Sequence, residues 1–434
     1  MTPLYSQAEK AILWNAFFWG MGNGLISTSL VTYLIRDICS GNPTAPVATV
    51  IAWIVAAPRI AGLLRLTVPA LIDRFGSRKW FTILGFALSP LVLLGIPLGV
   101  PPLIHYASLG TVLGLLVVIW CLYHLIEYFG TISLWAIIGD LIPQESRSRF
   151  VGVREGMMIF GQTLGFFVCG WYTHYRIGSL PEGIPKWECY FQPTYWGITG
   201  LLVAVIPLLW ITEIPWKKAE SGLRPAMRQL LAPLRSRPFW MLVLFGVYLQ
   251  MAGGLSQSVQ HTYQMNVLHI SLFFSLFAQN TTRIGQAVFA PVNGHWIERL
   301  GYFPVMCVSL MIVSCGSLCY FFADPSRWWW FYVAAIVWIF WVGVNVGIHS
   351  LVLSLSPPEN KASGIAIYYT ASTFSFAMFT LLGGFLADRF CDSVFVISDW
   401  GITWDYAHCS FLASFILRLS AIVLLFLIAT RIRR

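Results

Sequence analysis

Residues 59–76 read RIAGLLRLTVPALIDRFG, and residues 283–301 read RIGQAVFAPVNGHWIERLG. Each stretch opens on Arg-Ile, continues through a mostly apolar run and ends on an acidic residue, an arginine, one apolar residue and a glycine. Arg59 precedes Arg74 by 15 residues and Arg283 precedes Arg299 by 16, which in a helix is roughly 22 Å. A hydrocarbon core is about 30 Å thick, so both leading arginines lie near its middle. This pair of segments predicts a duplicated membrane protein with cations at mid-membrane depth.

The composition is that of a chain solvated by lipid. Of the 434 residues, 57% are hydrophobic and 10% charged, and the mean hydropathy is +0.72. Soluble domains carry about 25% charged residues, so we expect the lipid bilayer to be the main partner. The net charge of +9 is spread over alternate loops, which argues against a nucleic-acid partner.

Apolar runs of spanning length predict an all-α polytopic membrane protein with twelve transmembrane helices in two pseudo-symmetric six-helix bundles. The predicted spans are 11–35, 46–71, 80–99, 111–139, 151–172, 194–212, 238–262, 269–297, 303–323, 328–356, 362–387 and 409–430.

The basic residues set the predicted domains and orientation. An amino-terminal bundle is expected over 1–212, a basic cytoplasmic linker over 213–237 and a carboxy-terminal bundle over 238–434. Most Lys and Arg residues fall in the linker and in loops on its side, which predicts that both termini are cytoplasmic in a cell-membrane protein. Cys391 and Cys409 flank one predicted external loop and are candidates for a disulfide.

The two halves also match after spans 4 and 10. Residues 139–147 read GDLIPQESR and residues 355–361 read LSPPENK, and a glycine follows each in the next span. In both segments a proline ends the preceding helix, and a turn with one acidic and one basic residue follows. Repeated halves are typical of secondary transporters.

At these residues the chain resembles the major facilitator superfamily, whose loop between helices 2 and 3 carries Gly-x-x-x-Asp-Arg-x-Gly-Arg-Arg/Lys. The matching residues are Asp73, Arg74, Gly76, Arg78 and Lys79. Ser77 is an extra residue before Arg78, and Pro69 stands where the motif has its leading glycine. Because that glycine allows two helices to pack closely in the family, the sequence does not decide whether the same contact forms here. The weaker copy keeps Gly294, Glu298, Arg299 and Gly301.

The resemblance implies two bundles that rock about a central site. In that picture the two motif copies form a cytoplasmic gate. Asp73 and its basic neighbours would act as a charge latch, that is, their ion pairs would stabilise the outward-open state. The gating candidates are Asp73, Arg74, Gly76, Arg78, Glu298 and Arg299. The alternative is that these are ordinary loop charges of the cytoplasmic side.

Polar residues near the two deep arginines are the candidate substrate site. Ser275, Gln279, Asn280, Arg283 and Gln286 recur at helical spacing, so this face turns to a cavity or to another helix. Arg59 either contacts substrate or is neutralised by Glu127. The candidate substrate-binding residues are Arg59, Arg283, Asn280, Gln279, Gln257 and Asn345.

Glu127 is the only acidic residue predicted near the depth of Arg59. It lies 13 residues before Asp140, or about 20 Å along a helix. One hypothesis makes Glu127 the proton-coupling site with His124 nearby; the other makes it a permanent ion-pair partner of Arg59. Arg418 in span 12 has no sequence-level explanation.

These features predict a secondary active transporter of a small solute, with an anion preferred because deep cations outnumber deep acids, and with proton-coupled symport as a hypothesis. Transport of a neutral sugar and a transporter-like receptor without transport are the alternatives. No nucleotide-binding loop or catalytic constellation is found. We therefore expect no enzyme activity, no metal, no cofactor and a monomer.

Overall fold

The computed structural model describes residues 6–42, 44–66, 71–72, 75–212, 232–356, 361–390, 394–397 and 402–432. The chain divides into two compact units. Unit 1 comprises Met1–Ala45, Ala61–Ala219 and Ser271–Asn280, and unit 2 comprises Pro46–Ile60, Glu220–Ile270 and Thr281–Arg434. Relative to the predicted bundles, the units exchange the segments 46–60 and 271–280.

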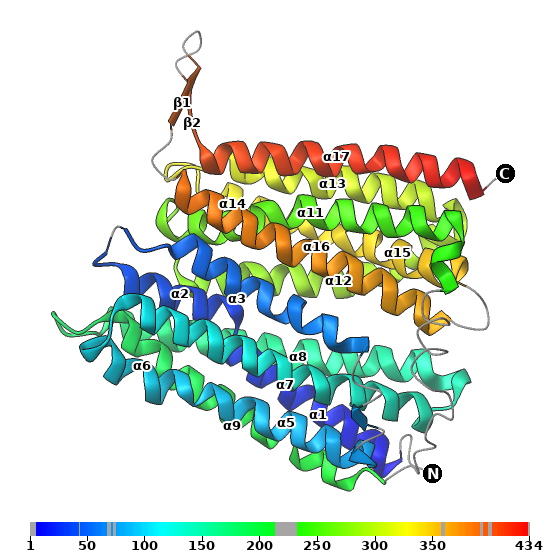
Figure 1. Ribbon diagram of the computed structural model, residues 1–434, viewed down its shortest axis with the longest axis horizontal. Helices are drawn as coiled ribbons and strands as arrows, with labels where there is room; N and C mark the ends of the chain where they lie inside the picture. The colour runs from blue at the N-terminus through cyan, green and yellow to red at the C-terminus, as the bar shows by residue number, and fades with distance from the viewer. Residues whose placement is uncertain are drawn as a thin grey trace. The chain divides into compact units, whose positions relative to one another are not determined.

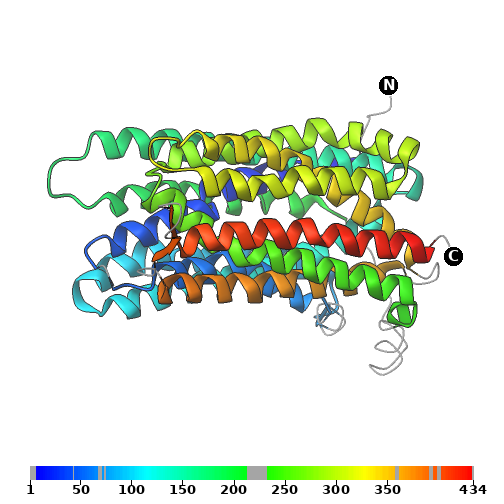
Figure 2. The same cartoon turned by 90° about the horizontal axis from the view of Figure 1, so that it is seen from above.

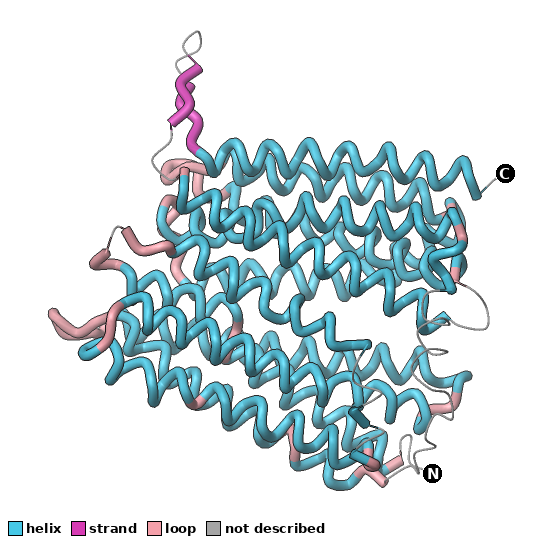
Figure 3. The backbone as a smooth tube through the Cα atoms, in the orientation of Figure 1, coloured by secondary structure: helices cyan, strands magenta, loops and turns pink. Residues whose placement is uncertain are grey.

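Among the described residues, each predicted span is helical over most of its length, as the element labels of Figure 1 and the helix colour of Figure 3 show. In the first half the elements are α1 (Gln7–Leu25), α2 (Thr28–Cys39), α3 (Val47–Ala61), η1 (Gly62–Leu66), α5 (Arg78–Leu93), α6 (Gly95–Tyr106), α7 (Leu109–Leu141), α8 (Gln144–Gly178), η2 (Lys186–Tyr190), α9 (Phe191–Val203) and η3 (Ile206–Trp210).

In the second half they are η4 (Ala232–Arg235), α11 (Arg237–Asn266), α12 (Leu272–Leu300), α13 (Tyr302–Phe322), α14 (Trp330–Val337), η5 (Trp338–Phe340), α15 (Trp341–Leu355), α16 (Lys361–Arg389) and α17 (Tyr406–Ile432). Within the described ranges, nine helices are long and apolar enough to cross a membrane by length and composition.

Several predicted boundaries were wrong. The first span is interrupted at Ile26, and Ser27 caps the continuing helix α2 by accepting a hydrogen bond from the Leu30 amide at 3.1 Å. The third span continues as α6 to Tyr106 through Pro101 and Pro102. These prolines remove N–H donors without ending the helix, so the loop predicted over 100–110 is much shorter.

The repeated motif has a structural counterpart at its final glycine. Gly76 and Gly301 have φ values of +79° and +87°. This left-handed conformation favours glycine, which has no Cβ to clash with the backbone. Each glycine lies just before the next helix, α5 or α13. A glycine with positive φ therefore ends both copies of the motif.

Glycines also set the closest helix packing in each unit. A Cβ at Gly161 of α8 would overlap the carbonyl oxygen of Phe17 in α1, within unit 1. In unit 2, a Cβ at Gly254 of α11 would overlap the carbonyl oxygen of Phe376 in α16. Figure 2 shows α11, α16 and α17 of unit 2 side by side in green, orange and red.

The loop after α16 forms a β-hairpin, which the all-α prediction did not include. Strands β1 (Val394–Ile397) and β2 (Ile402–Asp405) are antiparallel, with Val394 opposite Asp405 and Ile397 opposite Ile402. Their β-branched and aromatic residues favour the strand conformation. The hairpin projects from the start of α17 (Figure 1). Cys391 lies outside the described residues, so its pairing with Cys409 stays a prediction.

Candidate functional site

The candidate residues are divided between the units. Unit 1 holds Glu127, His124, Gln279 and Asn280, whereas unit 2 holds Arg59, Arg283, Gln257 and Asn345. The pairing of Arg59 with Glu127 therefore stays a prediction.

Arg59 contacts an aromatic side chain that the sequence did not single out. Its guanidinium carbon Cζ lies 5.0 Å from the centroid of the Phe376 ring, a distance at which a cation is attracted to the face of an aromatic ring. Arg59 comes from α3 and Phe376 from α16, and both belong to unit 2. Phe376 is buried, whereas Arg59 is exposed.

The same Phe376 ring lies close to Arg418 of α17. A Cβ built at Gly253 of α11 would be 3.5 Å from Arg418 Nη2 and 3.7 Å from Phe376 Cε2. Arg418 is only 5% exposed, and its Nε has no hydrogen-bond partner within the described part of the chain. The structure thus places this unexplained arginine beside the ring that Arg59 contacts.

Polar residues of α12 attach this helix to its neighbours. Gln279 donates to Ser29 Oγ of α2 at 2.6 Å, and Asn280 donates to the Thr163 carbonyl of α8 at 3.4 Å. Further along, the Gln286 amide donates to the Trp338 carbonyl at 3.0 Å. Gln279, Asn280 and Gln286 therefore face other helices, which is one of the two alternatives that the sequence left open for this polar face.

Arg283 differs from the other polar residues of α12. It is exposed, and it takes part in none of the ion pairs found between described residues. In unit 2 the guanidinium is therefore open to an external partner.

Glu127 is held within its own helix. Its carboxylate accepts a hydrogen bond from the Thr131 hydroxyl, one turn further along α7, at 2.6 Å. His124 packs edge-on against Trp120 at 4.8 Å between ring centroids, and its Nε2 is buried without a hydrogen-bond partner in the described ranges. No hydrogen bond between described residues joins His124 to Glu127.

Other polar side chains in the spans have partners inside their units. Asn15 donates to the Ala204 carbonyl at 2.8 Å, which fits a structural role. Gln257 lies 3.4 Å from His261 Nε2, one turn along α11. On α15, His349 contacts the Asn345 carbonyl oxygen at 2.7 Å through Nδ1 and the Tyr369 hydroxyl at 2.7 Å through Nε2. Asn345 itself is exposed.

The gating candidates are described only in part. Asp73 and Arg74 lie outside the described residues, so the latch stays a prediction. Arg78 forms an ion pair with Asp140, and its carbonyl accepts a hydrogen bond from Ser133 at 3.1 Å. In the second copy, Glu298 and Arg299 are exposed.

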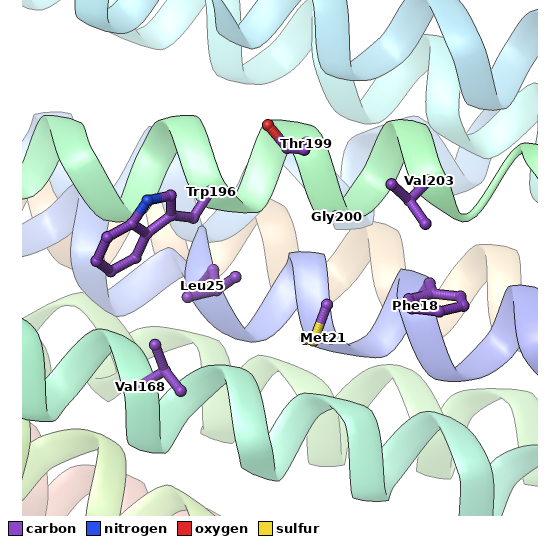
Figure 4. A pocket seen from close by; sticks show the side chains of 8 residues that line it. All are labelled: Phe18, Met21, Leu25, Val168, Trp196, Thr199, Gly200 and Val203. Carbon is purple, nitrogen blue, oxygen red and sulfur yellow. The ribbon is translucent and has the colours of Figure 1, made fainter.

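One surface hollow in unit 1 is too apolar to bind a charged solute. It has a volume of about 320 Å³ and lies between α1, α8 and α9 (Figure 4). Thr199 supplies its only side-chain hydroxyl, which already donates to the Tyr195 carbonyl at 2.9 Å. The lining residues are Phe18, Met21, Leu25, Val168, Trp196, Thr199, Gly200 and Val203.

Comparisons with known proteins identify the family. The model of the Major Facilitator Superfamily matches residues 12–279 and 251–434. No curated relative matches the chain.

Solved structures with the same fold cover nearly the whole chain. A variant of the nucleoside transporter NupG is 15% identical over 98% of this chain and 99% of its own, with a TM-score of 0.69. The xylose transporter XylE from E. coli, in a partially occluded inward-open conformation, is 14% identical over 97% and 96%, with a TM-score of 0.64. The peptide transporter POT in complex with sulfate is 10% identical over 99% and 95%, with a TM-score of 0.69.

These similarities establish an all-α fold of twelve transmembrane helices in two halves. Together with the family match over both halves, they exclude an enzyme and identify a membrane transporter. The chain belongs to the Major Facilitator Superfamily.

Proposed function

We propose that this transporter moves a small solute by alternating access and prefers an anion. The observation that carries the proposal is the charge distribution of unit 2. Three of its arginines, Arg59, Arg283 and Arg418, lie inside helical spans, whereas its described acidic residues lie at the ends of helices, at the end of strand β2 or in a loop. Those acidic residues are Glu298, Asp324, Asp388 and Asp405.

Positive charge inside membrane spans is costly unless a negative group balances it. A cation inside a membrane costs on the order of 3 kcal/mol or more, and such residues usually mark a solute or ion pathway. Arg283 and Arg418 take part in none of the ion pairs found between the described residues. An anionic solute supplies the missing charge.

Counterflow in proteoliposomes tests this preference. Purified protein is loaded with acetate, gluconate, phosphate or the neutral sugar xylose, and uptake of the labelled solute is followed. We expect flux of at least one anion, and a reduction of about 10- to 100-fold in Arg59→Ala and Arg283→Ala, because hydrogen bonds to charged groups contribute about 1.5–3 kcal/mol. Arg327→Ala, in an exposed loop, is the matched control.

Unchanged anion flux in both folded span variants would contradict the proposal. Flux of xylose alone would favour the neutral-solute alternative, which the fold also accommodates. Binding of a solute without flux under any imposed gradient would favour a receptor.

We further propose that Glu127 couples transport to protons. A charged Glu127 would balance Arg59 when the anion is absent, and a protonated Glu127 would leave the arginine to the solute. Proton and anion would then move together without an uncompensated buried charge. Thr131, which donates to this carboxylate, would hold it in place.

The proposed setting is a monomer in the cell membrane with both termini cytoplasmic. Its bundles would be 1–212 and 238–434, joined by the basic linker 213–237, and the motif residues from Asp73 to Lys79 would lie at the cytoplasmic side. The positive charge of the linker supports this orientation.

A further inference from the structure

Arg418 is a buried charge with no partner in the described structure. It lies near the middle of α17, it is 5% exposed, and it takes part in none of the hydrogen bonds and ion pairs found between described residues. Nearby polar groups bond to each other instead. Ser414, one turn earlier, donates to the Ala252 carbonyl at 2.7 Å and accepts from Ser256 at 3.1 Å. Ser414 and Ser256 are therefore hydrogen-bonded here, whereas among the described residues the Arg418 guanidinium is not.

Gly253 faces this guanidinium, and the room that its missing side chain leaves there is that of one methyl group. A Cβ there would meet Arg418 Nη2 at 3.5 Å and Phe376 Cε2 at 3.7 Å, which are ordinary contact distances. An alanine would thus fit without a clash, unlike at Gly254, where a Cβ would overlap the Phe376 backbone. Close helix packing therefore does not require glycine at position 253, and the presence of a glycine there must have another reason.

The Phe376 ring lies near both Arg418 and Arg59. Phe376 Cε2 and Arg418 Nη2 both lie within 4 Å of the same point beside Gly253, and Arg59 Cζ lies 5.0 Å from the ring centroid. All four residues belong to unit 2 and come from four different helices. Two guanidinium groups therefore lie close to a single aromatic side chain.

We propose that Arg418, Gly253 and Phe376 form an oxyanion subsite. In it Arg418 binds a carboxylate or phosphate group of the transported anion, through the space that Gly253 leaves, and Phe376 separates this subsite from Arg59. The proposal rests on the proposed anion preference and extends it to α17. A planar guanidinium suits such a ligand because two of its N–H groups donate in parallel to two oxygens.

The subsite explains why Arg418 is buried in α17 without an acidic partner among the described residues. An ion pair inside the protein would compete with the ligand for the guanidinium, whereas an empty partner position leaves the charge to the ligand. The arrangement also predicts opposite effects on stability and on binding. Replacing Arg418 by an apolar side chain removes an uncompensated buried charge, so the unliganded protein should not lose stability.

Thermal unfolding of the full chain in detergent tests the subsite, with inorganic phosphate and acetate as probes and chloride exchanged at constant ionic strength. A ligand that binds the folded state raises the unfolding midpoint with its concentration. The variants are Arg418→Met, Gly253→Ala and Arg59→Met. The matched control is Gly99→Ala, whose Cβ would meet a Leu115 side chain in unit 1 at the same 3.5 Å.

We expect the wild type and Gly99→Ala to respond to at least one probe. The apparent affinity should be at least about tenfold weaker in Arg418→Met and in Gly253→Ala, without a lower midpoint in the absence of probe. If Arg418→Met does not fold, Gly253→Ala decides the question alone.

Two results would overturn the subsite. If the wild type responds, Arg59→Met loses the response and both Arg418→Met and Gly253→Ala keep it, the subsite is wrong while the anion preference stands. If the wild type responds to neither probe, the anion preference fails and the subsite fails with it.

Discussion

The α1–α8 pair of unit 1 and the α11–α16 pair of unit 2 come from corresponding spans of the two halves, and both pack through glycines. At Gly161 and at Gly254 a Cβ would overlap a carbonyl oxygen of the partner helix, Phe17 or Phe376. Gly253 differs, because it faces a guanidinium and a ring at ordinary contact distance. Backbone packing therefore requires glycine at position 254 but not at position 253.

The largest expected effect tests the packing side of this comparison. Gly161→Ala and Gly254→Ala should each lower the free energy of unfolding by about 1–3 kcal/mol, because the added methyl group forces two backbones apart. Gly253→Ala should cause no loss, since alanine is the better helix former. Thermal unfolding in detergent measures all three variants. Equal stability of the three would show that Gly254 and Gly253 do not differ as described.

The charge of the two units differs as well, and Glu127→Gln tests that difference. Unit 1 has a carboxylate inside α7, whereas unit 2 has arginines inside its spans. With one proton per solute, a gradient of one pH unit supplies about 1.4 kcal/mol, or tenfold accumulation. We expect the variant to lose this accumulation in proteoliposomes but to keep solute exchange.

Asp324→Asn, in a loop, removes an acid outside the spans and is the control for Glu127→Gln. Accumulation by Glu127→Gln at the wild-type level would make Glu127 a structural residue and would place coupling elsewhere.

Asp388 joins two helices within unit 2, and its removal should have a smaller effect. Its carboxylate accepts hydrogen bonds from the Ala48 and Thr49 amides at 3.0 and 2.6 Å, and so caps the amino end of α3 from α16. Loss of a helix cap costs about 1 kcal/mol. Asp388→Ala should lower the unfolding midpoint accordingly, and Glu298→Ala, an exposed acid, should not. An unchanged midpoint in Asp388→Ala would show that this cap adds nothing to stability.

The smallest expected effect concerns pH at the hairpin. Burial raises the pKa of Asp405, but hydrogen bonds from the His408 side chain at 2.7 Å and its amide at 2.9 Å outweigh burial and hold this pKa below the ordinary 3.8. Its contribution to stability is therefore present above pH 3.8 and is lost as the pH falls through the lowered pKa.

We expect Asp405→Asn to unfold at a slightly lower temperature than the wild type at pH 7, with a difference that shrinks at acid pH. A difference that is independent of pH would contradict this account of Asp405.

Much of the fold could be predicted because hydropathy and turn chemistry are local properties. The spans follow from apolar runs, and the repeated Asp/Glu-Arg-x-Gly segments indicated two matching turns, in which Gly76 and Gly301 both adopt positive φ. The interruption at Ile26 and the hairpin over Val394–Asp405 were missed. A membrane-length apolar run does not show where a serine caps a new helix, and four-residue strands leave only a weak pattern.

The sequence by itself determined the membrane setting, the twelve spans and the duplicated motif, because length and apolarity fix these. The depth of Arg59 and Arg283 stays a prediction from the helical rise. Only the tertiary structure decided which side chains meet. It turned Gln279 and Gln286 toward neighbouring helices, and it brought Phe376 close to Arg59 and Gly253 close to both Phe376 and Arg418. Those four residues are far apart in the chain, and helix packing alone brings them together.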